Sequence, residues 1–75
     1  MELKEFIENF ADQFDDTDAS EITASTVFHE LDVWSSLTGM GVIAFAKTEY
    51  GKAITGAELR ACVTVEDVFN LIKNK

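Results

Sequence analysis

The sequence predicts an all-α fold, and three observations support this prediction. Apolar residues recur at helical spacing in several segments, proline is absent, and no long segment alternates apolar and polar residues as a half-buried strand does. A chain of 75 residues can bury only one hydrophobic core. We therefore expect a single domain over residues 1–75, built as a bundle of three longer helices and one short third helix, with a long first loop.

The first helix is expected over residues 3–14. Its apolar side chains follow the spacing i, i+3, i+4, i+7 and i+11, and they are Leu3, Phe6, Ile7, Phe10 and Phe14. Polar side chains occupy the opposite face: Glu2, Glu5, Glu8, Asn9 and Asp12. This pattern predicts an amphipathic helix whose phenylalanines pack in the core.

A long connection follows, from Asp15 to Trp34, and its helical periodicity is weak. We expect residues 15–18 to form a solvated acidic turn, and expect four apolar residues to pack the loop against the core: Ile22, Val27, Phe28 and Leu31. Asp16, Asp18 and Ser20 could fill the first positions of a calcium loop, but Glu21 stands where glycine is required and Val27 where glutamate is required. The calcium-loop pattern therefore fails.

The central helix is expected from Ser36 to Tyr50, because Gly51 suits the left-handed position that ends a helix. From residue 37 to residue 46 only Thr38 is polar, so apolar side chains point in nearly every direction. Such a helix is either buried on all sides or offers a face to a partner. Gly39 and Gly41 each lower helix stability by about 1 kcal/mol relative to alanine, and they could admit a partner or a cargo.

Two capping boxes predict the remaining helices. Thr55 followed by Glu58 begins a short third helix, and Thr64 followed by Asp67 begins the last one. In the last helix the expected buried residues are Val65, Val68, Phe69 and Ile72.

Composition and charge exclude several function classes. Six basic and fourteen acidic residues give a net charge of −8, which opposes binding to nucleic acid and to anionic membranes. No apolar run is long enough to span a membrane, and the N-terminus lacks the features of a signal peptide. Cys62 is the single cysteine, so no internal disulfide can form, and we expect a cytoplasmic monomer.

The residue types in the sequence give little support for a catalytic function. Cys62 and His29 form the only conceivable nucleophile and base, and nothing in their flanking residues indicates an activated thiol. The same two residues are too few for a zinc site. We therefore expect a protein that is not an enzyme, and a cysteine-dependent enzyme is the weakest of the hypotheses.

Two hydroxyls precede the central helix. Ser35 is a suitable N-cap, and one serine satisfies that role. Ser36 would then be exposed beside the positive end of the helix dipole, where a phosphate ester is stabilised. Ser36 is therefore a candidate modification site.

At these residues the chain resembles the acyl carrier protein family. That family has an Asp-Ser-Leu triplet at the start of its second helix, and Ser35, Ser36 and Leu37 occupy it here. Tyr50 at the end of that helix, Ile54 after it and the residues 64–67 also match the family's pattern. The resemblance extends over the whole chain in length, acidity and helix order, although Ser35 replaces the family's aspartate.

The resemblance implies that Ser36 carries 4′-phosphopantetheine. A separate phosphopantetheinyl transferase would attach it with Mg²⁺ and coenzyme A, and the arm would then hold acyl or aminoacyl groups as thioesters and present them to loading and transferring enzymes. The pathway implied is fatty-acid, specialised lipid or secondary-metabolite synthesis.

The central helix also departs from the family, whose second helix is usually rich in acidic residues. Here Glu49 is its only acid, so we expect an apolar partner surface that suits a few specialised enzymes, formed by Met40, Gly41, Ala44 and Phe45. The alternative function is a small helical adaptor that binds a protein partner through the same helix and holds no prosthetic group.

Overall fold

The protein is all-α over the residues that the structure describes. This computed structural model describes residues 2–14, 21–31 and 34–75. The helices are α1 (Leu3–Ala11), the 3₁₀ helix η2 (Phe28–Glu30), α2 (Ser36–Tyr50), α3 (Gly56–Ala61) and α4 (Val65–Lys73). The described residues contain no strand, which confirms the predicted fold class, and none of their helices is long and apolar enough to cross a membrane.

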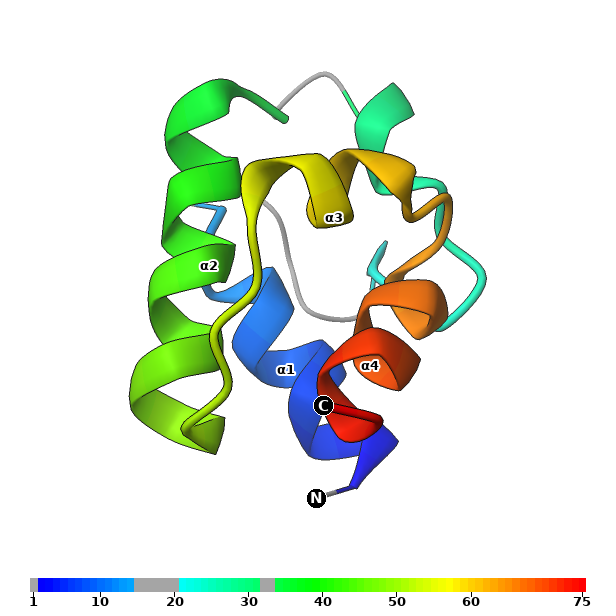
Figure 1. Cartoon of the computed structure of the whole chain (residues 1–75). Coiled ribbons are helices and arrows are strands. Elements are labelled where there is room, and N and C mark those ends of the chain that lie inside the picture. Colours follow the sequence, from blue (N-terminus) through cyan, green and yellow to red (C-terminus); the bar gives the residue numbers. More distant parts are fainter. Residues whose placement is uncertain (1, 15–20, 32–33) are drawn as a thin grey trace.

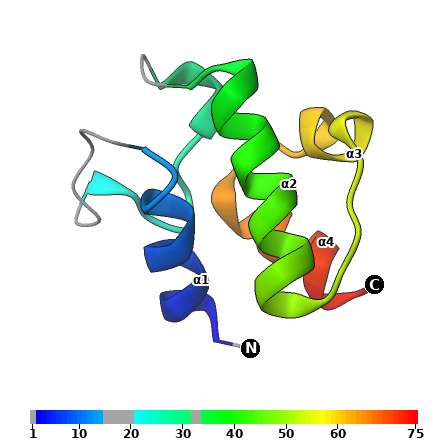
Figure 2. The same cartoon turned by 90° about the vertical axis from the view of Figure 1, so that its left-hand side faces the viewer.

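The helices form a small bundle in which the short α3 lies beside the half of α2 that contains its start (Figures 1 and 2). The long α2 runs along one side, α1 packs against α4, and α3 packs against α2 (Figures 1 and 2). Because the connection from α2 to α3 returns along the length of α2, α3 lies close to the end where α2 begins (Figure 1). This arrangement places the start of α2 and the whole of α3 around one site.

Helix α1 is shorter than expected, because it ends at Ala11 instead of residue 14. The chain tightens there into i→i+3 hydrogen bonds: the amide of Gln13 donates to Phe10 O at 3.1 Å and that of Phe14 to Ala11 O at 3.0 Å. Phe14 nevertheless stays buried, with its ring centroid 6.0 Å from that of Phe10. Its apolar contact was predicted correctly, and its helical conformation was not.

Asn9 also differs from its expected place on the solvated face. It is half-buried, and its Nδ2 donates a hydrogen bond to the hydroxyl of Tyr50 at 3.0 Å. This bond joins the last turn of α1 to the last residue of α2.

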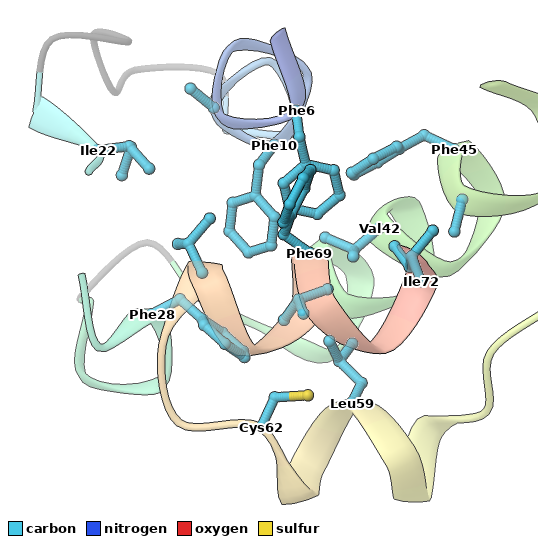
Figure 3. Packing of buried hydrophobic residues seen from close by; sticks show 14 of the residues in the cluster. Phe6, Phe10, Ile22, Phe28, Val42, Phe45, Leu59, Cys62, Phe69 and Ile72 are labelled. Atoms are coloured by element: carbon cyan, nitrogen blue, oxygen red, sulfur yellow. The ribbon is translucent and has the colours of Figure 1, made fainter. Parts of the chain in front are cut away.

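The core is largely aromatic. The ring of Phe6 lies 5.6 Å from that of Phe45 and 5.5 Å from that of Phe69, so one side chain of α1 contacts both α2 and α4 (Figure 3). Phe10 lies 5.4 Å from Phe28. Each such ring buries about 150–250 Å², and this burial is the main stabilisation available to a domain without disulfides.

The described part of the long connection packs against the core and against α4. Ile22 and Phe28 are buried, and the two other residues expected to contact the core, Val27 and Leu31, are half-buried. Two backbone bonds attach this segment to the start of α4: Val65 N donates to Thr26 O at 3.1 Å and Glu66 N to Ala24 O at 2.9 Å. The expected acidic turn at residues 15–18, with Asp16, Asp18 and Ser20, lies outside the described residues.

The predicted capping residues of α2, α3 and α4 are confirmed. Both capping boxes form, at Thr55 with Glu58 and at Thr64 with Asp67. Gly51 ends α2 with φ of 66°, a left-handed conformation that glycine adopts without steric cost.

Candidate functional site

The two serines at the start of α2 have different environments. The Ser35 backbone is extended, and its Oγ accepts a hydrogen bond from Thr38 N at 3.3 Å, so Ser35 is the N-cap as predicted. Ser36 is the first helical residue, and it is exposed. Its hydroxyl has no hydrogen-bond partner among the described residues, so Ser36 is accessible at the positive end of the α2 dipole.

A pocket of about 390 Å³ opens beside Ser36, between α2 and α3. Its walls include Ser36, Gly39 and Met40 from α2, Leu59 and Arg60 from α3, and Trp34 from the preceding loop. We call it the α2–α3 pocket. Its volume is within the range of about 300–1,000 Å³ of small-ligand sites, and an apolar lining with few polar groups is typical of them.

The two central glycines face different neighbours. A Cβ on Gly39 would lie 3.5 Å from Cζ2 of Trp34 and 3.6 Å from Cδ2 of Leu59, so Gly39 forms part of the pocket wall at ordinary contact distance. A Cβ on Gly41 would lie only 2.6 Å from Oε1 of Gln13. A side chain at Gly41 would therefore have to displace the end of the Gln13 side chain, whereas one at Gly39 would not displace its neighbours.

One face of α2 leaves apolar side chains exposed. Leu37 is 78% exposed and Met40 is 66% exposed, and Ala44 is exposed on the same face. The half-buried Gly41 lies between them, because residues 37, 40, 41 and 44 follow helical spacing. We call Leu37, Met40, Gly41 and Ala44 the exposed face of α2.

Phe45 is not part of this face, and its expected contact with a partner is wrong. Only 7% of the residue is exposed, and its ring lies 5.6 Å from that of Phe6 and 6.1 Å from that of Tyr50. Residue 45 is 100° further around the helix than Ala44, which turns its side chain into the core (Figure 3). On this side of α2 the exposed residues are Met40 and Ala44 instead.

The cysteine and the histidine each meet a backbone carbonyl of α3. Sγ of the buried Cys62 donates to Glu58 O at 3.4 Å, and Nε2 of His29 lies 3.4 Å from Leu59 O. Burial, and then the charges of Asp67 and Glu58, raise the pKa of the Cys62 thiol. A raised pKa disfavours the thiolate, which is the nucleophilic form, so these contacts indicate a core cysteine.

No metal site was found among the residues that the structure describes, because they contain no cluster of three or more histidine, cysteine, aspartate or glutamate residues suited to a metal. The polar side chains that line the pocket are those of His29, Ser35, Ser36 and Arg60.

Among the pocket residues that were not identified as site residues from the sequence are Leu59 and Arg60. The signal that could have found them is the Thr55 capping box, which begins a helix five residues after α2 ends. A six-residue helix is stable only when packed, and α2 is its nearest long neighbour.

Comparisons of this chain with protein-family models, with curated proteins and with solved structures found no match. The functional argument therefore depends on the residues and on their geometry.

Proposed function

We propose that this protein is a carrier that holds acyl groups on a 4′-phosphopantetheine arm attached to Ser36. The observation that supports this most directly is the position of Ser36, which is exposed at the first turn of α2 and forms part of the rim of the α2–α3 pocket. A tether at this point can extend into water and can also fold back over the cavity.

The residues at the start of α2 fit a phosphate ester. The first amides of a helix have no intrahelical acceptor, and they favour an anion on Ser36. Ser35 holds the first turn through its bond to Thr38 N, as an aspartate would, but without a second negative charge beside the phosphate. The replacement of aspartate by Ser35 therefore keeps the cap and reduces repulsion.

The attachment step requires a separate transferase. The Ser36 hydroxyl loses its proton and attacks the pyrophosphate of coenzyme A; a phosphoester bond to Ser36 forms, a phosphoanhydride bond breaks, and adenosine 3′,5′-bisphosphate leaves. Once attached, the arm supplies a terminal thiol that holds the cargo as a thioester. The chain's own part is to expose Ser36 and to shelter the cargo.

The cargo class follows from the pocket beside the attachment point. Trp34, Met40 and Leu59 give it apolar walls, which favours an acyl chain over an aminoacyl group, since the latter needs no cleft. The apolar exposed face of α2 favours partner enzymes with apolar docking surfaces, as in a specialised lipid or secondary-metabolite pathway. We place the protein in the cytoplasm, where its free thiol stays reduced.

The proposal is tested by intact-mass measurement after incubation with a broad-specificity phosphopantetheinyl transferase, Mg²⁺ and coenzyme A. We expect a mass gain of one phosphopantetheine group in the wild type and in Ser35→Gly, since glycine is an acceptable N-cap, and no gain in Ser36→Ala. An unmodified wild type, or a modified Ser36→Ala, would refute the assignment.

A second candidate function is supported by the exposure of Leu37 and Met40, two large apolar side chains on one face. A helical adaptor would bind a protein through this face without any prosthetic group. If Met40→Glu abolishes the binding of a partner that the Ser36→Ala protein still binds, and no transferase modifies the wild type, the adaptor is the correct function.

A further inference from the structure

Arg60 gives the α2–α3 pocket a positive charge in an otherwise acidic molecule. It is the one formally charged side chain among the described residues that line this pocket. Its Nη1 lies 3.3 Å from the point where a Cβ on Gly56 would be, so the guanidinium of this exposed residue folds back over the first turn of α3. The missing side chain at position 56 makes room for it.

The nearest acid on the same helix does not neutralise this charge. Glu58 accepts a hydrogen bond from Thr55 N on Oε1 at 2.9 Å, and its Oε2 forms an ion pair with Lys75 Nζ at 2.8 Å. Both carboxylate oxygens are therefore occupied, and Arg60 has no ion pair among the residues that the structure describes. Its charge remains available to a ligand in the pocket.

We infer that the α2–α3 pocket accepts an apolar chain that bears a carboxylate, and that Arg60 is the residue that selects this carboxylate. The apolar walls at Trp34, Leu59 and Ile43 receive the chain, and the planar guanidinium suits the two oxygens of a carboxylate. This inference deepens the proposed function: the cargo would be an acyl group with a carboxylate in addition to its thioester, such as the half-thioester of a dicarboxylic acid.

The net charge of −8 acts against this selection, because the whole molecule repels anions. The two effects make opposite predictions for ligands of equal chain length. If the electrostatic field of the whole molecule dominates binding, a cationic ligand binds most tightly. If Arg60 decides, a carboxylate binds best, since a charge-assisted hydrogen bond at short range outweighs charges that water screens.

The test uses the unmodified protein and three eight-carbon probes: octanoate, 1-octanol and octylammonium. Trp34 is the only tryptophan and lines the pocket, so its fluorescence reports binding. We expect octanoate to bind about tenfold more tightly than 1-octanol, which corresponds to one charge-assisted hydrogen bond, and octylammonium to bind weakest. In Arg60→Gln the preference for octanoate should disappear.

A matched control removes one positive charge at a position that lies away from the pocket. Lys47→Gln changes an exposed cation near the other end of α2, and it should keep the preference for octanoate. The inference is wrong if octylammonium or 1-octanol binds as tightly as octanoate, if Lys47→Gln loses the preference as Arg60→Gln does, or if none of the probes binds. Unchanged circular dichroism of Arg60→Gln shows that any loss of binding is local.

This experiment and the mass test can fail separately, because the titration needs no group on Ser36. A protein that is modified on Ser36 and shows no preference for octanoate is a carrier without this selectivity. A protein that prefers octanoate and is not modified binds free carboxylates and is not a carrier.

Discussion

Neighbouring positions on α2 have opposite roles. Met40 and Ala44 belong to the exposed face, while Val42 and Phe45 are buried. Because each residue turns the helix by 100°, a single step along the chain moves a side chain from water to the aromatic core. Substitutions that remove a similar number of side-chain atoms at exposed and at buried positions of α2 therefore have very different effects on the free energy of unfolding.

We expect Phe45→Ala to lower the free energy of unfolding by about 3–5 kcal/mol, because it removes a ring from a packed cluster. Met40→Ala should change it by no more than about 0.5 kcal/mol, as is usual for a surface substitution. Urea denaturation followed by circular dichroism measures both. Equal losses in the two variants would show that the exposed face of α2 is covered by other parts of the chain.

At the scale of the helices, the two glycines inside α2 allow the effect of helix propensity on stability to be distinguished from the effect of packing. Gly39 has room for a methyl group at ordinary contact distance, whereas at Gly41 a methyl group would displace the Gln13 side chain, whose Nε2 donates to Asn9 O at 3.2 Å. Both positions have the same intrinsic preference for alanine.

Gly39→Ala should therefore raise the free energy of unfolding by up to about 1 kcal/mol, the difference in helix propensity, and should narrow the α2–α3 pocket. Gly41→Ala should raise the free energy of unfolding by less, because the close contact of the new methyl group with Gln13 offsets the gain from the higher helix propensity of alanine. Thermal melts of the two variants test this difference. A Gly41→Ala protein more stable than Gly39→Ala would contradict it.

The start of α4 is sensitive to acid through its capping box. Asp67 Oδ2 accepts hydrogen bonds from Thr64 N and from Val63 N, both at 3.0 Å, and these bonds lower the pKa of Asp67. A carboxyl whose pKa is lower in the folded state contributes stability above its ordinary pKa of about 3.9, and this contribution is lost as the pH falls through the folded value.

Asp67→Asn should therefore destabilise the protein at about pH 6 and have less effect at about pH 3, because a larger share of the wild-type carboxyl is protonated at the lower pH. Denaturant titrations of both proteins at the two pH values measure the change. Glu66→Gln removes a charge from the same turn and leaves the capping box intact, so its effect serves as the control. If Asp67→Asn lowers the free energy of unfolding equally at both pH values, the capping carboxylate is not the source of the lost stability.

At the scale of the whole molecule, repulsion among acidic side chains opposes folding. The net charge is −8 on 75 residues, and the described residues contain one ion pair, between Lys75 and Glu58. A domain of this size buries only about 60% of the surface of its unfolded chain, so little stabilisation from burial is available to offset this repulsion.

Added sodium chloride or a divalent cation should raise the melting temperature, because salt screens this repulsion. A double variant of the exposed face of α1, Glu5→Gln with Glu8→Gln, reduces the net charge from −8 to −6 and should melt higher at low salt with a smaller response to salt. A melting temperature that does not change with ionic strength would show that repulsion is unimportant.

The sequence predicted what depends on local chemistry. The bounds of α2, the Ser35 cap, the two capping boxes and the left-handed Gly51 all follow from interactions within a few residues, and the structure has each of them. The buried residues of α4 were predicted because its amphipathic pattern is clear.

What the sequence could not give depends on contacts between distant residues. Helix α2 is apolar on all sides, so its pattern could not separate the buried Phe45 from the exposed Met40. The Thr55 capping box predicts α3 itself, but Arg60 reaches the pocket wall only because the connection between the helices returns along α2, and no local pattern specifies that packing.

The two bonds from the start of α4 to the carbonyls of Thr26 and Ala24 also constrain the order of assembly during synthesis. On the ribosome, α1 and α2 can begin to coil as soon as they emerge, but the carbonyls of Thr26 and Ala24 do not receive these two bonds until the amides of residues 65 and 66 have emerged as well. The aromatic rings of α1 therefore stay partly exposed to water until late in translation. During this interval the nascent chain is most accessible to a chaperone or a protease.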